Sequence, residues 1–308
     1  MTIRVFTPIY KAVIDVLPRP IINSATPNSG NQNQTLNVVL AGKYLIDAQT
    51  VEFWDGGITV NSFLVNSDTQ ITANITIAEF CPPGLKNILV TSPDGTGILL
   101  DGFTVVGIEH TLVVEATHSG YIMCSGENGD TYYYVHHNAL ATYDPETWPL
   151  RWIGQFYDAA IPRFYVMRDA LIFDTPVPSG AVITGATLSL YGREDCSDTD
   201  FDIVIVSGAD LADILVKEDY GDLLNAITSF GQLTSVGLVI EGWNVITLNA
   251  LGVAAITKGG TTRFGLRSSR DISITTPKLN AGDADESVRV YDHTVANKKP
   301  KLTITYTL

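Results

Sequence analysis

Residues 181–191 read Ala-Val-Ile-Thr-Gly-Ala-Thr-Leu-Ser-Leu-Tyr. From Val182 to Tyr191, apolar side chains alternate with small or polar ones, which is the period of a half-buried β-strand. The end of the chain repeats this alternation, because Leu302, Ile304 and Tyr306 fall on one face of another predicted strand. A sandwich whose first and last strands lie side by side needs such a closing strand. These two stretches predict a β-sandwich for the second part of the chain.

Strand signals also fill the rest of the sequence. In the first part, residues 35–40 and 70–77 alternate in the same way, and turns such as Pro93-Asp94-Gly95 separate the runs. Seven or so short strands over about 90 residues describe an immunoglobulin-like sandwich. Only residues 210–226 and 249–257 look helical, so we expect an all-β chain with one or two short helices. The strands predicted in the second part also include Thr111–Glu115, Tyr121–Cys124, Thr131–His136, Phe164–Phe173, Phe201–Ser207, Asn244–Leu248, Thr262–Arg267 and Ser287–Tyr291.

The composition fits a folded chain without nucleic-acid partners. Hydrophobic residues make up 45% of the 308 residues and charged residues 17%, which is typical of globular proteins. The net charge of −14 repels phosphate backbones, and the only basic cluster is Lys298, Lys299 and Lys301. No run of about 18 apolar residues occurs, so no membrane-spanning helix is predicted. The three cysteines are odd in number and widely spaced, which argues against a disulfide framework.

The sequence predicts three parts: an arm over 1–17, a first sandwich over 18–107 and a second over 108–308. The boundary falls near Gly107, after a strand predicted over 103–106. The arm lacks the basic region and apolar stretch of a signal peptide. It does contain apolar runs, and a free apolar arm is a hazard in water. We therefore expect it to pair with a sheet of its own chain or of another subunit, through Ile3, Val5 and Phe6.

The first sandwich contains an ordered set of short segments. They are Pro20-Ile21-Ile22-Asn23-Ser24, Pro27-Asn28-Ser29-Gly30, Thr35-Leu36-Asn37-Val38, Val51-Glu52-Phe53, Ile58-Thr59-Val60 and Gln70-Ile71-Thr72-Ala73. In this order they resemble an IPT/TIG immunoglobulin-like domain over 18–107. The resemblance implies a module that serves as a spacer, a stalk or a contact domain.

Residues 108–308 contain a second ordered set. It comprises Arg168-Asp169-Ala170-Leu171-Ile172-Phe173-Asp174-Thr175, the opening stretch 181–191, Gly242-Trp243-Asn244, Phe264-Gly265-Leu266-Arg267 and Lys299-Pro300-Lys301-Leu302-Thr303-Ile304-Thr305-Tyr306. This set resembles the DNRLRE-type β-sandwich, a jelly roll related to carbohydrate-binding modules. The resemblance implies occurrence in prokaryotic surface proteins and in phage-encoded structural proteins.

The sequence offers no catalytic motif. It contains no Gly-x-Ser-x-Gly, no glycine-rich phosphate loop with Lys and no His-Glu-x-x-His. His136 and His137 are predicted to point to opposite faces of a strand, so they do not chelate one metal. Arg168 lies within an apolar strand, and we expect it to be buried against a carboxylate such as Asp169 or Asp174. The chain is therefore predicted to be non-enzymatic, with no catalytic residues.

Two acidic loops are candidate calcium sites. Asp198 and Asp200 alternate in one loop, and Asp283 and Asp285 alternate in another. Alternate aspartates can supply oxygen ligands to Ca²⁺, although Ile203 stands where an EF-hand loop needs Gly. The second resemblance implies that calcium is common in jelly rolls of this kind. The alternative is that both loops are simply solvated, and we expect no other cofactor.

Aromatic residues crowd the stretch from Tyr132 to Tyr157. Sugars stack on exposed Trp and Tyr rings, and protein interfaces are also enriched in them, whereas the alternative for each ring is core packing. Trp148, beside Pro149 in a predicted loop, is the ring we most expect to be exposed. The candidate sugar-binding residues are Trp148, Trp152, Tyr132, Tyr134 and Tyr143.

Two assignments of function stay open. The first is a phage virion surface component, a capsid decoration or a tail part, since two extracellular-type sandwiches occur without a signal peptide. Its partners would be other copies of itself or other virion proteins. The second is a secreted or surface-assembled prokaryotic adhesin, filament subunit or carbohydrate-binding protein, with surface glycans as partners. A glycan-active enzyme is a third class, for which the sequence shows no motif. The first two place the protein on a virion surface or outside the cell.

Overall fold

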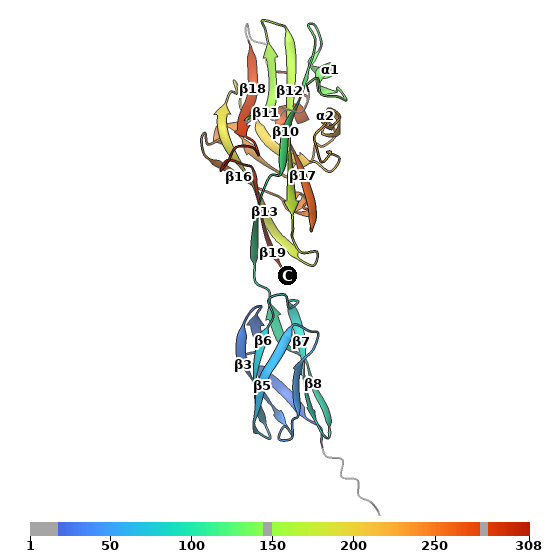
Figure 1. Ribbon diagram of the computed structural model, residues 1–308, viewed down its shortest axis with the longest axis vertical. Coiled ribbons are helices and arrows are strands. Elements are labelled where there is room, and N and C mark those ends of the chain that lie inside the picture. The colour runs from blue at the N-terminus through green and yellow to red at the C-terminus, as the bar shows by residue number, and fades with distance from the viewer. Residues whose placement is uncertain (1–17, 144–149, 278–282) are drawn as a thin grey trace, which may run out of the picture. The chain divides into compact units, whose positions relative to one another are not determined.

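The computed structural model describes residues 18–143, 150–277 and 283–308 (Figure 1). Strands make up 54% of the structure and helices 8%, which confirms the predicted all-β, sandwich-type class. The chain forms two compact units: unit 1 ends at Ile108 and includes Leu308, and unit 2 spans Glu109–Thr307. This division lies close to Gly107, where the sequence places the boundary. The predicted contact residues of the arm, Ile3, Val5 and Phe6, lie outside the described residues.

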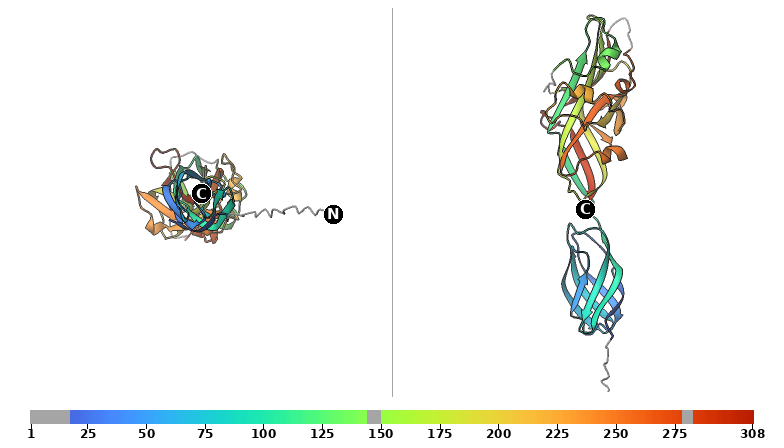
Figure 2. Two further views of the ribbon diagram at one scale, coloured as in Figure 1. Left: turned by 90° about the horizontal axis from the view of Figure 1, so that it is seen from below. Right: turned by 90° about the vertical axis from the view of Figure 1, so that its right-hand side faces the viewer.

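Unit 1 is a sandwich in which two four-stranded sheets lie face to face (Figure 2). Alternation puts one side of each strand into the core, where Leu40, Ile75 and Phe103 are fully buried. The Phe103 ring meets Phe53 edge to face, with ring centroids 5.3 Å apart. One sheet has the order β1 (Ile21–Thr26), β3 (Thr35–Lys43), β6 (Gln70–Ile77) and β5 (Ile58–Ser67). The other has the order β2 (Ser29–Asn31), β8 (Gly95–Val106), β7 (Gly84–Ser92) and β4 (Thr50–Phe53).

Unit 2 is built from longer strands. Its first strand, β9 (His110–Glu115), pairs with its last, β19 (Lys301–Thr307), as the sequence predicts for a closed sandwich. The opening stretch of the sequence lies in β13 (Val182–Asp195), which pairs with β19 and β16 (Trp243–Thr247) over its first part. After a register shift between Gly192 and Glu194, β13 pairs with β18 (Ala284–Tyr291) instead. This strand therefore joins the two layers of the sandwich.

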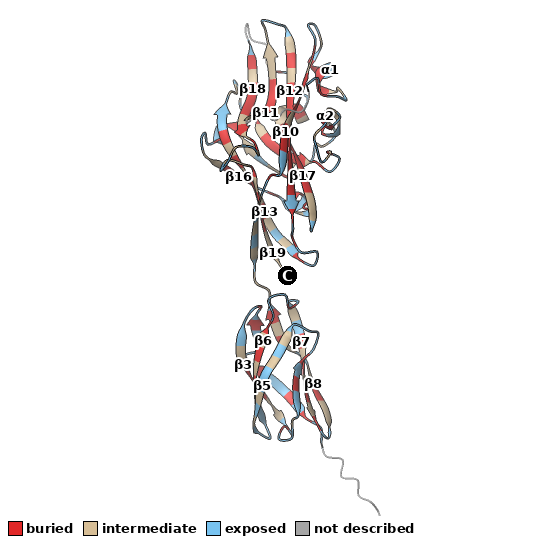
Figure 3. Cartoon of the chain, viewed as in Figure 1, coloured by how far each residue is buried: buried red, intermediate tan, exposed pale blue. Residues whose placement is uncertain are grey.

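The second layer of unit 2 centres on β12 (Arg163–Thr175), which is buried over most of its length (Figure 3). It pairs with β10 (His118–Ser125) and with β11 (Leu150–Asp158), and β11 in turn pairs with β18. Its later residues pair with β17 (Gly260–Ser268). Beyond β17 lie β14 (Asp202–Ser207) and β15 (Gly231–Thr234).

The short helices correct two sequence predictions. Residues 131–136, predicted as a strand, form α1 (Tyr132–His136), because the Thr131 side chain accepts a hydrogen bond from the Tyr134 amide and caps a helix. The rings of His136 and His137 are therefore 4.5 Å apart rather than on opposite faces. The helix predicted over 210–226 shrinks to α2 (Asp219–Asp222). The described helices also include α3 (Ala250–Ala254), which is capped by Asn249 as predicted, and α4 (Ser269–Ile272).

Arg168 is fully buried as predicted, but its carboxylate partner is neither Asp169 nor Asp174. The guanidinium makes two hydrogen bonds to Asp271, of 2.9 and 3.0 Å, across 103 positions of sequence. Arg267 donates to the same carboxylate at 2.6 Å. The two guanidinium groups hold the pKa of Asp271 well below its usual value although burial opposes this. This buried ion cluster attaches α4 to the sheet.

Candidate aromatic binding hollow

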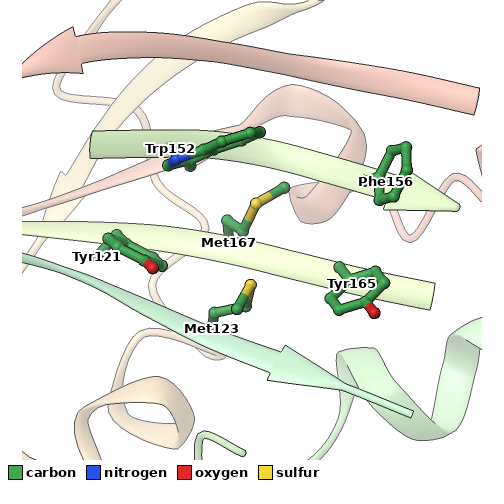
Figure 4. Close-up of a pocket in the computed structure, with 6 residues that line it drawn as sticks. All are labelled: Tyr121, Met123, Trp152, Phe156, Tyr165 and Met167. Atoms are coloured by element: carbon green, nitrogen blue, oxygen red, sulfur yellow. The ribbon is translucent and has the colours of Figure 1, made fainter. Parts of the chain in front are cut away.

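Six side chains from three neighbouring strands surround a hollow of about 260 Å³ (Figure 4). Each strand contributes two side chains from one face, two residues apart on β10 and β12 and four apart on β11, since side chains on one face of a strand recur with a period of two. The register aligns the pairs, because Met123 lies opposite Met167 and Phe156 lies opposite Tyr165. The lining residues, here called the aromatic hollow, are Tyr121 and Met123 of β10, Trp152 and Phe156 of β11, and Tyr165 and Met167 of β12.

Four rings surround two thioethers in this hollow. Figure 4 shows Met123 and Met167 in the middle of the hollow, with Trp152 and Tyr121 on one side and Phe156 and Tyr165 on the other. Met167 is buried, with 3% of its surface exposed, whereas the four rings are partly exposed. The Phe156 and Tyr165 rings are 5.7 Å apart. Since thioethers are polarizable and adapt in shape, they form an apolar floor below aromatic walls.

Gly154 lets β11 approach β18 closely between two residues of the hollow. It lies between Trp152 and Phe156 in the sequence and opposite Met167 in the strand register. Its φ of 137° is one that side-chain-bearing residues rarely adopt, and a Cβ there would lie 2.1 Å from the Glu286 carbonyl oxygen. The backbone of β11 thus requires glycine at this point.

Polar groups of β18 lie beside the aromatic walls. The Arg289 guanidinium stacks on the Trp152 ring, 3.6 Å from its centroid, and also bonds to Glu194 at 2.8 Å. Asp285 lies opposite Phe156 in register and accepts a 2.5 Å hydrogen bond from the Ser287 hydroxyl. Burial raises the pKa of Asp285 to about 6. The site therefore combines apolar ring faces with a few fixed polar groups, which is the chemistry of a small-ligand pocket.

A buried polar network supports the hollow from the reverse face of β11. The Gln155 side chain accepts a 2.5 Å hydrogen bond from the Tyr132 hydroxyl and donates to Glu286 at 2.6 Å and to the Thr275 carbonyl at 2.8 Å. Glu286 also accepts a hydrogen bond of 2.9 Å from Thr199. Because Tyr132, Gln155 and Glu286 are buried, the network fixes the strand that carries Trp152 and Phe156.

The sequence candidates have different positions in the structure. Trp152 is a wall of the hollow. Tyr132 is only 4% exposed, so its ring has no face for a sugar, and this candidate is wrong because the ring packs into the core through α1. Tyr134 and Tyr143 are exposed by 59% and 37% but do not line the hollow. Trp148 lies outside the described residues.

Five lining residues were not among the sequence candidates. Phe156 belonged to the noted aromatic crowd, while the others are Tyr121, Met123, Tyr165 and Met167. The signal that could have found them is the recurrence of large apolar residues two or four positions apart on three strands. Only the strand register, which places Met123 opposite Met167 across 44 positions of sequence, brings the three pairs together.

The four aspartates predicted to bind calcium do not assemble a donor set. Asp198 and Asp285 do lie together, but each carboxylate is engaged locally: Asp198 accepts the Asp285 amide at 3.0 Å, and Asp285 accepts Ser287. Asp283 accepts the Ala159 amide at 2.9 Å, and the backbone carbonyl of Asp200 accepts Arg270 at 3.0 Å. Calcium takes six to eight oxygen ligands. Within residues 18–143, 150–277 and 283–308, no group of three or more His, Cys, Asp or Glu is placed to hold a metal.

Comparisons with known proteins give only distant similarity. No protein-family model matches this chain, and no curated protein matches its sequence. Among solved structures, SGBP-B from a complex xyloglucan utilization locus of Bacteroides uniformis is 9% identical with a TM-score of 0.22, covering 94% of this chain and 72% of that one. SGBP-B of a Bacteroides ovatus mixed-linkage glucan utilization locus, in complex with a heptasaccharide, is 13% identical with a TM-score of 0.22, covering 92% and 53%.

A third solved structure, the surface glycan-binding protein PbSGBP-B from Prevotella bryantii, is 9% identical with a TM-score of 0.20, covering 90% of this chain and 92% of that one. With TM-scores this low, neither the fold nor the site of this chain is derived from these structures. Among the helices of the described residues, none has the length and apolar character needed to cross a membrane.

Proposed function

We propose that this chain is a non-enzymatic glycan-binding protein that acts outside the cell, and that the aromatic hollow holds a sugar ring. The observation that carries the proposal is the set of partly exposed rings of Trp152, Phe156 and Tyr165 over a methionine floor. The C–H faces of a sugar stack on such rings, while its hydroxyl groups need polar partners such as Arg289 and Asp285.

The size of the hollow favours a single sugar ring. Its volume of about 260 Å³ is below the roughly 300–1,000 Å³ of pockets for drug-sized ligands. The hollow is also backed by the Gln155 network, which holds the walls in place before a ligand arrives. A preformed site of this size would take one residue of a longer glycan.

The predicted virion component and the predicted surface glycan-binding protein differ in what supports them. The aromatic hollow favours glycan binding, and we adopt that assignment. No observation on the described residues favours a virion component over another surface protein, so the virion assignment stays a prediction. The IPT/TIG and DNRLRE resemblances likewise stay proposals for units 1 and 2.

A glycan array with the full chain tests the proposal, followed by calorimetric titration of the best neutral glycan. We expect Trp152→Ala to weaken binding at least tenfold, the equivalent of about 1.4 kcal/mol, because the largest wall of the hollow is lost. Trp54→Ala is the matched control, since Trp54 is a 59% exposed tryptophan of unit 1. Equal affinities for the two variants, with both folded by circular dichroism, would refute the site. An empty array would refute glycan binding itself.

A further inference from the structure

A second aromatic cluster adjoins the hollow along β18. Tyr191 of β13 pairs across strands with Trp243 of β16, and their rings meet edge to face at 5.2 Å. Tyr191 also meets Tyr291 of β18 edge to face at 5.6 Å. Tyr291 lies two residues beyond Arg289 and therefore on the same side of β18 as the group that stacks on Trp152. All three rings are partly exposed.

The basic residues that stand out in the sequence lie over these rings. The Lys298 ammonium is 3.9 Å from the Tyr291 ring centroid and 4.7 Å from that of Tyr191. The Lys301 ammonium is 4.7 Å from the centroid of Trp243. Cations over ring faces are attracted by the negative face of the ring. We call Tyr191, Trp243, Tyr291, Lys298 and Lys301 the lysine–aromatic cluster.

One carboxylate organises the cluster without neutralising it. Glu241 accepts hydrogen bonds from Lys298 at 2.8 Å, from the Tyr291 hydroxyl at 2.9 Å and from Arg193 at 3.1 Å. The bonds from Lys298 and Tyr291 lower the pKa of Glu241, so it is ionised at neutral pH. Arg193 and Lys298 thus share one carboxylate, and Lys301 adds a third cation over the Trp243 ring. Lys301 forms no ion pair with the described residues.

The surplus of positive charge is local. The whole chain carries −14, with only nineteen Lys and Arg. The neighbouring Lys299 does not add to the surplus, because Glu115 lies 3.5 Å away. A positive aromatic surface on an acidic protein complements a ligand that offers both flat apolar faces and anionic groups. Acidic sugars have both, since each ring has C–H faces and carries a carboxylate or sulfate.

We propose that the lysine–aromatic cluster is a subsite for an acidic sugar, so that the chain binds anionic polysaccharide across the hollow and the cluster. This inference rests on the proposed glycan function and adds the ligand class. The hollow holds a neutral ring, and Lys298 and Lys301 bind the anionic group of a ring further along the same glycan. Nucleic acid is the other anionic polymer with stacking faces, and the glycan function proposed for the adjoining hollow favours a polysaccharide over it.

Affinity electrophoresis of the full chain tests this with dextran, dextran sulfate and polygalacturonate as the probes. Dextran and dextran sulfate share one backbone and differ only in charge, and polygalacturonate separates carboxylate from sulfate recognition. We expect at least one anionic polymer to bind tenfold more tightly than dextran. Lys301→Gln and Trp243→Ala should each remove most of that preference. Lys43→Gln, which removes an exposed charge from unit 1, should leave it within twofold.

The outcomes separate the two proposals. A preference for anionic polymer that survives in both variants, or an equal affinity for oligothymidylate, would overturn the acidic-sugar subsite. Neutral glycan binding without any anionic preference would overturn it too, yet would leave the proposed function intact. If no polysaccharide and no array glycan binds, the proposed function fails first. Trp152→Ala should lower affinity for neutral glycan without abolishing the anionic preference.

Discussion

The interiors of the two units are built on different chemistry. The core of unit 1 is a cluster of aliphatic and aromatic side chains, from Ile22 to Val105. The interior of unit 2 contains complete charged groups, among them Arg168, Arg267 and Asp271 at zero exposure. Burying apolar surface is favourable wherever the surface is placed, whereas a buried charge is tolerated only beside its partner. The fold of unit 1 therefore follows from local alternation, and that of unit 2 also depends on pairs that are distant in sequence.

The charged interior of unit 2 also positions its loops. Arg168 donates to the Tyr220 carbonyl at 2.6 Å and to the His136 carbonyl at 3.1 Å, next to the ends of α2 and α1. Arg267 donates to the carbonyls of Leu223 and Leu224, both at 2.9 Å. These carbonyls lie in or just after the last turns of short helices, which leave their last carbonyl groups without helical partners. The two arginines thus attach the helical loops to the sheet behind the hollow.

The largest difference between the two units should appear when the carboxylate that Arg168 and Arg267 share is removed. Asp271→Asn leaves two buried guanidinium groups without their anion, which should cost unit 2 about 3–5 kcal/mol. Hydrogen exchange read by peptide should show this loss in unit 2 and no change in unit 1. Asp213→Asn is the matched control, because Asp213 pairs with Arg263 but is 81% exposed, and it should cost less than about 1 kcal/mol. Similar losses for the two variants would contradict the buried ion cluster as a structural determinant.

The reciprocal change targets the apolar core of unit 1. Ile75 has no exposed surface, and Ile75→Ala leaves a cavity that should cost roughly 2–5 kcal/mol. The same peptide-resolved exchange should now show the loss in unit 1 and spare unit 2. Ile98→Ala, at a 52% exposed position of the same unit, serves as the control and should have little effect. A loss of exchange protection spread equally over both units would contradict the view that the two interiors are stabilised separately.

The polar interior of unit 2 should also give its stability a smaller dependence on pH, which unit 1 should lack. Burial raises the pKa of Asp169 from 3.8 to about 7, and its second oxygen has no hydrogen-bond partner among the described residues. A raised folded-state pKa stabilises unit 2 below the unfolded pKa, and this contribution is lost as pH rises through about 7.

Denaturant midpoints of unit 2 between pH 5.5 and 8.5 check this expectation. The midpoint should fall in the wild type as pH rises to about 7 and level off above it, whereas Asp169→Asn, which stays neutral, should flatten the decline. Asp94→Asn, at an exposed turn of unit 1, should leave the slope unchanged. A wild-type slope that persists in Asp169→Asn would show that another group titrates.

The same contrast explains what the sequence could predict. Strands such as 35–40 and 182–191 are visible because alternation is local, and so is the cap at Asn249. The stretch 131–136 misled because its aromatic residues resemble a strand, although Tyr132, Val135 and His136 have the spacing of one helix face. The partner of Arg168 is 103 positions away, whereas the local sequence points to the neighbouring aspartates.

The sequence predicts an aromatic binding site, but it identifies only some of the residues that form it. Trp152 was identified from aromatic density, which is a local property. Tyr121 and Tyr165, and the lysine–aromatic cluster, required the strand register, since Trp243 lies opposite Tyr191 only through the β13–β16 pairing. Binding surfaces on sheets are assembled from residues on several strands, and no single stretch of sequence contains them.

The most direct test of the central claim uses the two methionines of the hollow floor. The chain has three methionines, Met1, Met123 and Met167, so selective ¹³C-methyl labelling gives two reporters in the hollow and one far away in sequence. On titration with the best neutral glycan of the array, the methyl signals of Met123 and Met167 should shift and saturate together, while that of Met1 stays unchanged. Saturable glycan binding that leaves both hollow signals unmoved would contradict the assignment of the aromatic hollow as the sugar site.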